Sequence, residues 1–109
     1  MARVHRPVRV GDLVINFRQR TVMRGMGLLL PITHNEFELL KMLAERKGET
    51  LTTEALFYGL YGHKPYDEWP ELTVIYTTMT NLRKKLDLTD LQRYIKAVYA
   101  IGYRLEDPG

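Results

Sequence analysis

Hydrophobic and polar residues alternate along the first third of the chain, which is the pattern of half-buried β-strands. Three apolar runs carry this pattern, at residues 8–17, 21–23 and 28–30. Turn residues interrupt this pattern: Gly11-Asp12 within the first run, and the Gly-Met-Gly segment at residues 25–27 between the second and third. The pattern predicts an antiparallel sheet of three or four strands.

The apolar spacing then changes to intervals of three and four residues, typical of amphipathic helices. Thr33 and Glu36 form a capping-box sequence at the start of a first helix, and we expect Gly48 to cap its end. Thr52 is the expected N-cap of a second, shorter helix that ends near Gly62.

A third helix is predicted from Pro70, which suits a first helical turn, to about Leu86. Apolar residues occur at i, i+4, i+7 and i+11, namely at Ile75, Met79, Leu82 and Leu86. This stripe must face the core, so geometry also sets the opposite surface. That surface holds Val74, Thr77, Thr78, Asn81, Lys84 and Lys85, with Thr80 and Arg83 on a flank.

Residues 94–98 and 103–105 predict two strands of a C-terminal hairpin that turns at residues 100–102. We expect Gly102 to adopt the positive φ of this turn. Tyr103 is expected in the core, whereas Tyr99 suits either DNA contact or packing. A basic helix followed by a hairpin is typical of an α+β winged helix-turn-helix fold.

At 109 residues and 45% hydrophobic content, the chain is expected to form one domain, residues 1–109. Its net charge of +3 is uneven: residues 1–32 carry +5, residues 33–72 carry −4 and residues 79–105 carry +4. A basic C-terminal region beside an acidic middle suggests two surfaces with different partners, the basic one suited to phosphates. Ordinary solvated charge is the alternative explanation of the charge pattern alone.

Several classes of function find no support in the composition. The chain has neither cysteine nor serine, and its three histidines are far apart in sequence, so we expect no enzyme, no metal site and no cofactor. No apolar run approaches the roughly 20 residues that span a bilayer, and the N-terminus is not signal-like. We therefore expect a cytoplasmic protein without a membrane partner.

The third helix has the side chains that read a major groove. Asn81 can pair with adenine through two hydrogen bonds, and the methyl groups of Val74, Thr77 and Thr78 can meet thymine methyls. The cations suited to phosphates are Arg83, Lys84 and Lys85, with Lys96 in the hairpin. This combination predicts double-stranded DNA as the partner and a half-site that contains A·T pairs. Alternatively, the basic triplet only complements the helix dipole.

Four stretches, in this order, resemble the effector domain of the OmpR/PhoB-type response regulators, above all its CtrA-like members. They are residues 33–40, 51–54 with 60–62, 82–86, and 94–98 with 102–105, within a resemblance that covers residues 8–107. The resemblance implies a four-stranded N-terminal sheet, three helices and a hairpin wing. It also implies that the third helix reads the major groove, that the wing reaches the minor groove and that the 62–70 loop touches RNA polymerase.

Carried over by position, Thr77, Thr78, Thr80 and Asn81 fall where the family reads bases and phosphates, and Arg83 falls at a phosphate contact. The chain departs from the family at Tyr76, where a polar residue is usual, and in the wing. There Ala97, Tyr99 and Ala100 replace Thr, Arg and Gly. Loss of the wing arginine removes a favourable minor-groove contact. A homodimer on tandem half-sites is one expected arrangement on DNA, and inverted half-sites are the alternative.

No receiver domain of about 120 residues accompanies these elements. We expect a stand-alone regulator rather than an excised effector half, because the chain opens directly into strand-like sequence. The rival function is a protein-interaction module on the same fold, which binds RNA polymerase or another regulator with little dependence on DNA. Its candidate contact residues are Tyr66, Asp67, Glu68 and Trp69.

Overall fold

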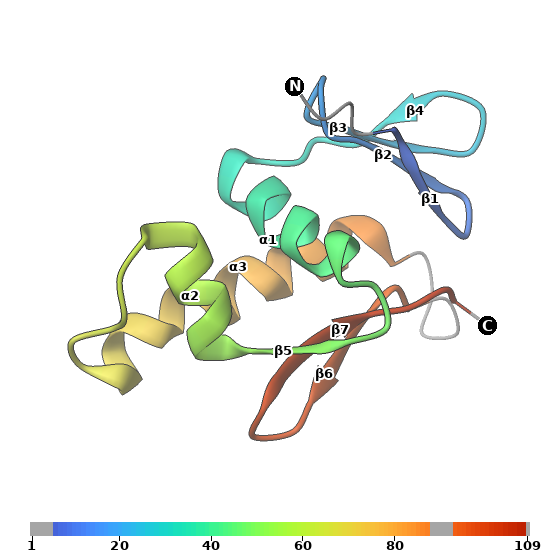
Figure 1. Ribbon diagram of the computed structural model, residues 1–109. Helices are drawn as coiled ribbons and strands as arrows, with labels where there is room; N and C mark the ends of the chain where they lie inside the picture. The colour runs from blue at the N-terminus through green and yellow to red at the C-terminus, as the bar shows by residue number, and fades with distance from the viewer. Residues whose placement is uncertain (1–5, 88–92, 109) are drawn as a thin grey trace.

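Two antiparallel sheets with three helices between them make up the structure (Figure 1). It is a computed structural model that describes residues 6–87 and 93–108, with only the backbone of Glu68 and Trp69. This arrangement confirms the predicted α+β winged-helix fold.

The N-terminal sheet is a four-stranded antiparallel meander in the order β1-β2-β3-β4. Its strands are β1 (Val8–Val10), β2 (Leu13–Asn16), β3 (Thr21–Arg24) and β4 (Leu28–Leu29). The predicted alternation is real, because Leu13 and Ile15 are fully buried while Val14 between them is half-exposed. One face of this sheet therefore packs on the helices.

The first two helices begin at the predicted caps. For α1 (His34–Glu45), the Thr33 side chain accepts a hydrogen bond from the Glu36 N–H, and Glu36 Oε1 accepts one from the Thr33 N–H at 2.9 Å. For α2 (Thr53–Tyr61), the Thr52 hydroxyl accepts from the Ala55 N–H at 3.0 Å, and Gly62 ends the helix in the left-handed conformation. Both capping predictions are confirmed.

The expectation that Gly48 caps α1 is wrong. Arg46 is the C-cap, and Gly48 lies in the following turn with φ +87°. Its N–H donates to the Leu105 carbonyl oxygen at 2.9 Å, so this glycine turns the chain towards the second sheet.

The third helix, α3 (Glu68–Leu86), begins two residues before the predicted start, and Pro70 lies in its first turn. Asp67 is its N-cap residue, and the Glu71 carboxylate accepts a hydrogen bond from the Tyr66 N–H at 2.9 Å. The predicted apolar stripe is confirmed, because Ile75, Met79, Leu82 and Leu86 are all fully buried. They pack against α1 and α2 in one core.

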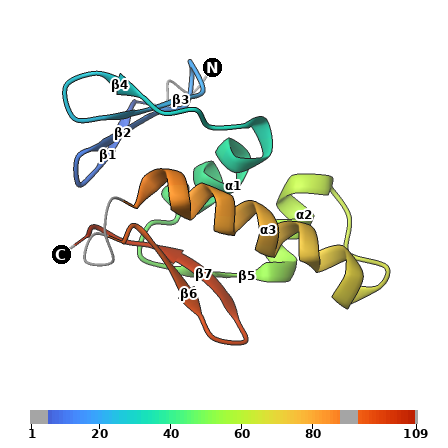
Figure 2. The same cartoon turned by 180° about the vertical axis from the view of Figure 1, so that it is seen from behind.

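The second sheet has three strands in the order β5-β7-β6, one more than the predicted hairpin. The hairpin strands are β6 (Ile95–Val98) and β7 (Gly102–Leu105), and β5 (Thr50–Thr52) pairs with β7 from just before α2. The hairpin projects away from the helices (Figures 1 and 2).

The hairpin turn also corrects the prediction for Gly102. Ala100 has the positive φ, at +60°, whereas Gly102 is the first residue of β7. A Cβ atom at Gly102 would lie 1.9 Å from the Leu51 carbonyl oxygen of β5. This glycine therefore allows the close approach of two strands, which the sequence of the hairpin alone does not reveal.

Candidate nucleic-acid interface

One face of α3 is exposed and free of acidic side chains. Its exposed residues are Thr73, Tyr76, Thr77, Thr80, Asn81 and Lys84. No Asp or Glu occurs between Leu72 and Leu86. The helix lies across one side of the molecule with the hairpin beside it (Figure 2). A duplex laid against this side meets both elements.

Thr80 belongs to this exposed face rather than to a flank. Thr73, Thr77, Thr80 and Lys84 repeat at i, i+4, i+7 and i+11, the spacing of the buried stripe shifted by two positions. The Thr80 hydroxyl donates to the Tyr76 carbonyl oxygen at 2.9 Å, so its methyl group and lone pairs remain for a partner. The same periodicity identifies Thr73, which the sequence analysis missed.

Two residues predicted for the outer face lie on its α1 flank instead. Val74 is half-buried and packs against the core. Lys85 Nζ lies 2.6 Å from Oε1 of Glu36, whose side chain is nearly fully buried. The ammonium of Lys85 thus neutralises a buried carboxylate of α1. Thr78, between them on the helix surface, is also half-buried.

Arg83 lies on the opposite flank, on the side of the hairpin. It is half-buried, and its Nε atom is buried without a hydrogen-bond partner among the described residues. Burial raises the pKa of Tyr103 in β7, the nearby Tyr76 phenol adds to the rise, and the charge of Arg83 opposes it. Arg83 therefore sits where helix and hairpin meet.

The hairpin cations are already paired within the protein. Lys96 Nζ lies 2.6 Å from Glu106 Oε2, and Arg104 Nε lies 2.5 Å from Glu106 Oε1. The hydrogen bond from Lys96, with the charge of Arg104, holds the pKa of Glu106 below its usual value. Lys96, which the sequence predicts as a phosphate contact, is thus exposed but engaged by an intramolecular carboxylate.

The hairpin turn leaves its apolar side chains in solvent. Tyr99 is 95% exposed and Ile101 is 52% exposed. Of the two uses considered for Tyr99, packing within the chain is therefore excluded. Tyr103 is buried in the core, as predicted.

A polar cluster around the buried Arg24 and Tyr94 holds the C-terminal end of α3. Arg24, at the end of β3, donates through Nη2 to the Leu86 carbonyl oxygen, and its Nη1 lies 3.4 Å from Asp12 Oδ1. The Tyr94 hydroxyl donates to the same Asp12 oxygen, and the Tyr94 N–H donates to Asp87 Oδ1 at 3.0 Å. These contacts join the N-terminal sheet, the end of α3 and the start of the hairpin.

The 62–70 loop forms a separate exposed surface. Tyr66 is 87% exposed and stacks on His63 with ring centroids 5.1 Å apart, and His63 in turn forms a T-shaped pair with Phe57. Asp67 is exposed at the α3 N-cap, whereas the side chains of Glu68 and Trp69 lie outside the described residues.

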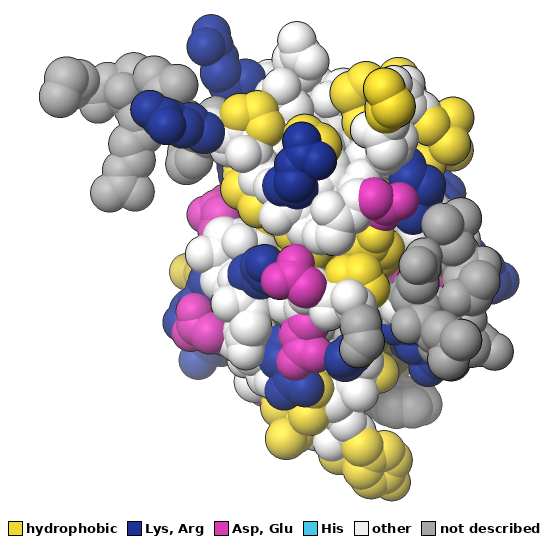
Figure 3. Space-filling model, turned by 90° about the vertical axis from the view of Figure 1, so that its right-hand side faces the viewer, with side chains coloured by type: hydrophobic (Ala, Val, Ile, Leu, Met, Phe, Trp, Pro, Cys, Tyr) yellow, Lys and Arg dark blue, Asp and Glu magenta, His cyan; other side chains and the backbone are white. Residues whose placement is uncertain are grey.

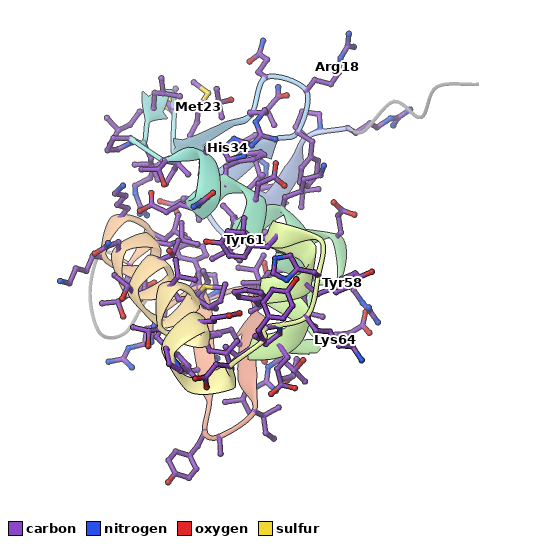
Figure 4. All side chains as sticks on the ribbon, turned by 90° about the vertical axis from the view of Figure 1, so that its left-hand side faces the viewer. Arg18, Met23, His34, Tyr58, Tyr61 and Lys64 are labelled. Carbon is purple, nitrogen blue, oxygen red and sulfur yellow. The ribbon has the colours of Figure 1, made fainter. Side chains whose placement is uncertain are left out.

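Beside this loop is a surface cavity of about 570 Å³ lined by Glu54, Ala55, Tyr58, Lys64 and Pro65. Figure 4 shows Tyr58 and Lys64 on the same side of the molecule, on α2 and the segment after it.

The described part of the chain offers neither a metal site nor a membrane-spanning helix. Across residues 6–87 and 93–108, no group of three or more His, Asp or Glu side chains could hold a metal ion. None of the described helices is long and apolar enough to cross a membrane.

The family model and the relatives that match this chain in sequence agree with each other. A family model described as "Transcriptional regulatory protein, C terminal" matches residues 27–105. The cell cycle response regulator CtrA of Brucella anthropi is 39% identical over an alignment of 120 positions, which takes in 99% of this chain and 50% of the relative. The chain thus spans about half the length of the curated relatives that it matches.

Solved structures of similar fold include DNA-binding domains. The Klebsiella pneumoniae RstA DNA-binding domain, in complex with the RstA box, is 27% identical, with a TM-score of 0.78 over 94% of this chain and 99% of that domain. The Thermotoga maritima response regulator DrrB, an OmpR/PhoB homologue, is 28% identical, with a TM-score of 0.78 over 92% of this chain and 44% of its own length. From the family match and these folds together, the chain belongs to the C-terminal domains of transcriptional regulatory proteins, of OmpR/PhoB type.

Proposed function

We propose that this chain is a transcription regulator that binds double-stranded DNA in a sequence-specific manner, with α3 in the major groove. The observation that carries the proposal is the exposed, acid-free face of α3 beside a projecting hairpin. A phosphate backbone repels carboxylates, so such a face suits a duplex. The likeness to a domain solved with its DNA box supports the same function.

The exposed side chains divide into two roles. Asn81 reads adenine through its amide, and the methyl groups of Thr77 and Thr80 meet thymine methyls. Lys84 is the exposed cation of the helix and binds phosphate, with Arg83 contributing beside the hairpin. Thr78 and Val74 contribute only through their half-exposed surfaces. The expected half-site contains A·T pairs, and tandem half-sites would accommodate a homodimer.

Selection from a randomised duplex pool, followed by fluorescence anisotropy at several salt concentrations, tests this function. We expect enrichment of an A·T-containing half-site and affinity that falls steeply with salt. Asn81→Ala should weaken the selected site roughly 10-fold while leaving an unrelated duplex unaffected, since it removes a base contact. The variant Tyr66→Ala is the matched control on the other surface. Uniformly weak binding to every duplex would contradict sequence-specific recognition.

A second function is favoured by the exposed aromatic residues around the 62–70 loop. We propose that Tyr66, Asp67 and the neighbouring cavity bind RNA polymerase, as Tyr side chains exposed beside a cavity suit a protein contact. Transcription in vitro with purified polymerase tests it. Tyr66→Ala with Tyr58→Ala should reduce activated transcription several-fold with DNA affinity unchanged. An unchanged transcript yield would remove this role from the loop.

We also propose that the domain has no catalytic role and acts in the cytoplasm, where its DNA partner lies. Whether a protein partner replaces DNA altogether is decided by the same selection experiment. In that case Asn81→Ala would have no effect, and the Tyr66 and Tyr58 variants would account for all loss of function.

A further inference from the structure

The tip of the β6–β7 hairpin exposes two large apolar side chains. Tyr99 and Ile101 flank Ala100 there, and both large side chains lie largely in solvent. In the space-filling view, hydrophobic atoms gather at the lower end of the molecule, over this tip (Figure 3). Apolar side chains that are exposed together on a projecting part of a protein are typical of a surface that contacts a partner.

Charge does not explain how this tip would bind. No residue from Ala97 to Tyr103 is charged, and the hairpin cations Lys96 and Arg104 are both paired with Glu106. In the register of the hairpin, Lys96 lies opposite Arg104, at the end away from the turn. Contacts made by the tip itself are therefore apolar and aromatic.

The tip is held in one shape. The Ile101 N–H donates to the Val98 carbonyl oxygen at 2.9 Å, and Ala100 occupies the left-handed region at φ +60°. Gly102 is packed against the β5 backbone immediately afterwards. Little backbone entropy remains to be lost when a partner binds, which suits insertion of the tip as a rigid unit.

The tip is continuous with the exposed face of α3. A shallow cavity of about 170 Å³ runs from Tyr76 of α3 to the turn, where Tyr99, Ala100 and Ile101 line it. The partner that lies along α3 therefore also reaches the tip. This continuity favours DNA over a separate protein as the occupant.

We propose that the tip enters the minor groove as an apolar wedge, with Tyr99 and Ile101 partly unstacking one base step and bending the duplex. The proposal rests on the proposed function and adds a specificity element to it. Apolar wedges kink DNA at steps that unstack easily, such as TA. The phenol ring of Tyr99 can stack on a base, and its hydroxyl can donate to the adenine N3 or thymine O2 acceptors of the groove floor.

Fluorescence of 2-aminopurine, placed at successive positions in the selected duplex, tests the wedge because it rises when a base unstacks. We expect the wild-type chain to raise the signal several-fold at one step beside the half-site. End-to-end energy transfer on the same duplex should report a bend. Loss of one stacked aromatic residue in Tyr99→Ala should remove both signals and weaken affinity about 10-fold.

Two variants separate the wedge from its alternatives. Tyr99→Arg should lose the fluorescence signal but steepen the salt dependence by about one unit, because it exchanges an apolar contact for an ionic one. Met26→Ala, at an exposed apolar side chain between β3 and β4 and away from the tip, should change neither signal. Because Tyr99 is 95% exposed, its variants should unfold at the wild-type temperature.

Tight binding to the selected duplex without any fluorescence rise or bend would overturn the wedge and leave the proposed function intact. So would a Tyr99→Ala variant that keeps wild-type DNA affinity and instead loses binding to a second copy or to RNA polymerase. Failure of the wild-type chain to bind any duplex would instead overturn the proposed function itself, and the wedge with it.

Discussion

At the scale of single residues, buried polar side chains fix how the parts of the molecule sit against each other. Arg24 is only 8% exposed, and its guanidinium contacts the final carbonyl of α3 and the Asp12 carboxylate. A cation at a helix C-terminus also stabilises the helix dipole. In sequence, Arg24 is one of six arginines in the first 32 residues, and nothing distinguishes it from the exposed ones.

We expect Arg24→Met to lower the free energy of unfolding by about 2 kcal/mol, because the Leu86 carbonyl loses this donor and the Asp12 carboxylate loses its counter-charge. Arg18→Met is the matched control, since Arg18 is exposed and points away from the molecule (Figure 4). It should change stability by less than about 0.5 kcal/mol. Urea unfolding measures both. Equal stability of the two variants would mean that Arg24 does not anchor α3.

At the scale of the elements, α3 carries three different surfaces. One stripe is buried in the core, one is exposed, and the flanks contact α1 and the hairpin. Neighbouring lysines at its C-terminal end consequently differ in use. Lys84 is exposed, whereas Lys85 pairs with the buried Glu36, which also closes the capping box of α1.

This difference predicts opposite effects of two adjacent substitutions. Lys84→Ala should reduce the slope of log affinity against log salt by about one unit and leave stability nearly unchanged. Lys85→Ala should leave the slope unchanged and lower the free energy of unfolding by about 1–2 kcal/mol, because Glu36 loses its counter-charge. DNA titrations at several salt concentrations and urea unfolding of both variants provide the comparison. If both variants reduced the slope of log affinity against log salt equally, Lys85 would have to leave Glu36 and bind phosphate, contrary to this prediction.

At the scale of the whole molecule, two buried tyrosines connect the sheets to the helices. Tyr94 joins the start of the hairpin to the β1–β2 turn through Asp12. Tyr103 is a buried residue of β7, close to Tyr76 and Arg83 of α3. Burial is the main cause that raises the pKa of both phenols above their usual value near 10, and the Asp12 contact adds to it at Tyr94. The folded state thus favours both neutral phenols.

Because the pKa of both phenols is raised in the folded state, the stability of the protein depends on pH in the alkaline range. The stabilisation is complete below pH 10, the usual phenol pKa, and is lost as the pH rises through the higher pKa of the folded state. We expect stability to fall above pH 10, by up to about 1.4 kcal/mol per pH unit for each tyrosine that titrates. Tyr94→Phe should flatten part of this fall in urea unfolding at successive pH values. A wild-type chain equally stable on both sides of pH 10 would contradict it.

The sequence by itself determined the local structure and much of the surface pattern of α3. The caps at Thr33 and Thr52 depend on hydrogen bonds to residues only three positions away, so consecutive residues encode them. The buried stripe from Ile75 to Leu86 follows from helical periodicity alone. The same periodicity places Thr77, Asn81 and Lys84 on the exposed side.

Only the tertiary structure decided which of those side chains remain free. Lys85 meets Glu36 across 49 positions of sequence, and Arg24 meets Leu86 across 62. Strand β5 forms because β7 lies beside it, and that approach determines the role of Gly102. Such partners are brought together by packing of the whole core, which no local pattern encodes. For that reason the sequence predicted the elements of the interface, and only the fold showed that Lys85 and Lys96 are engaged within the protein and that the hairpin tip is apolar and exposed.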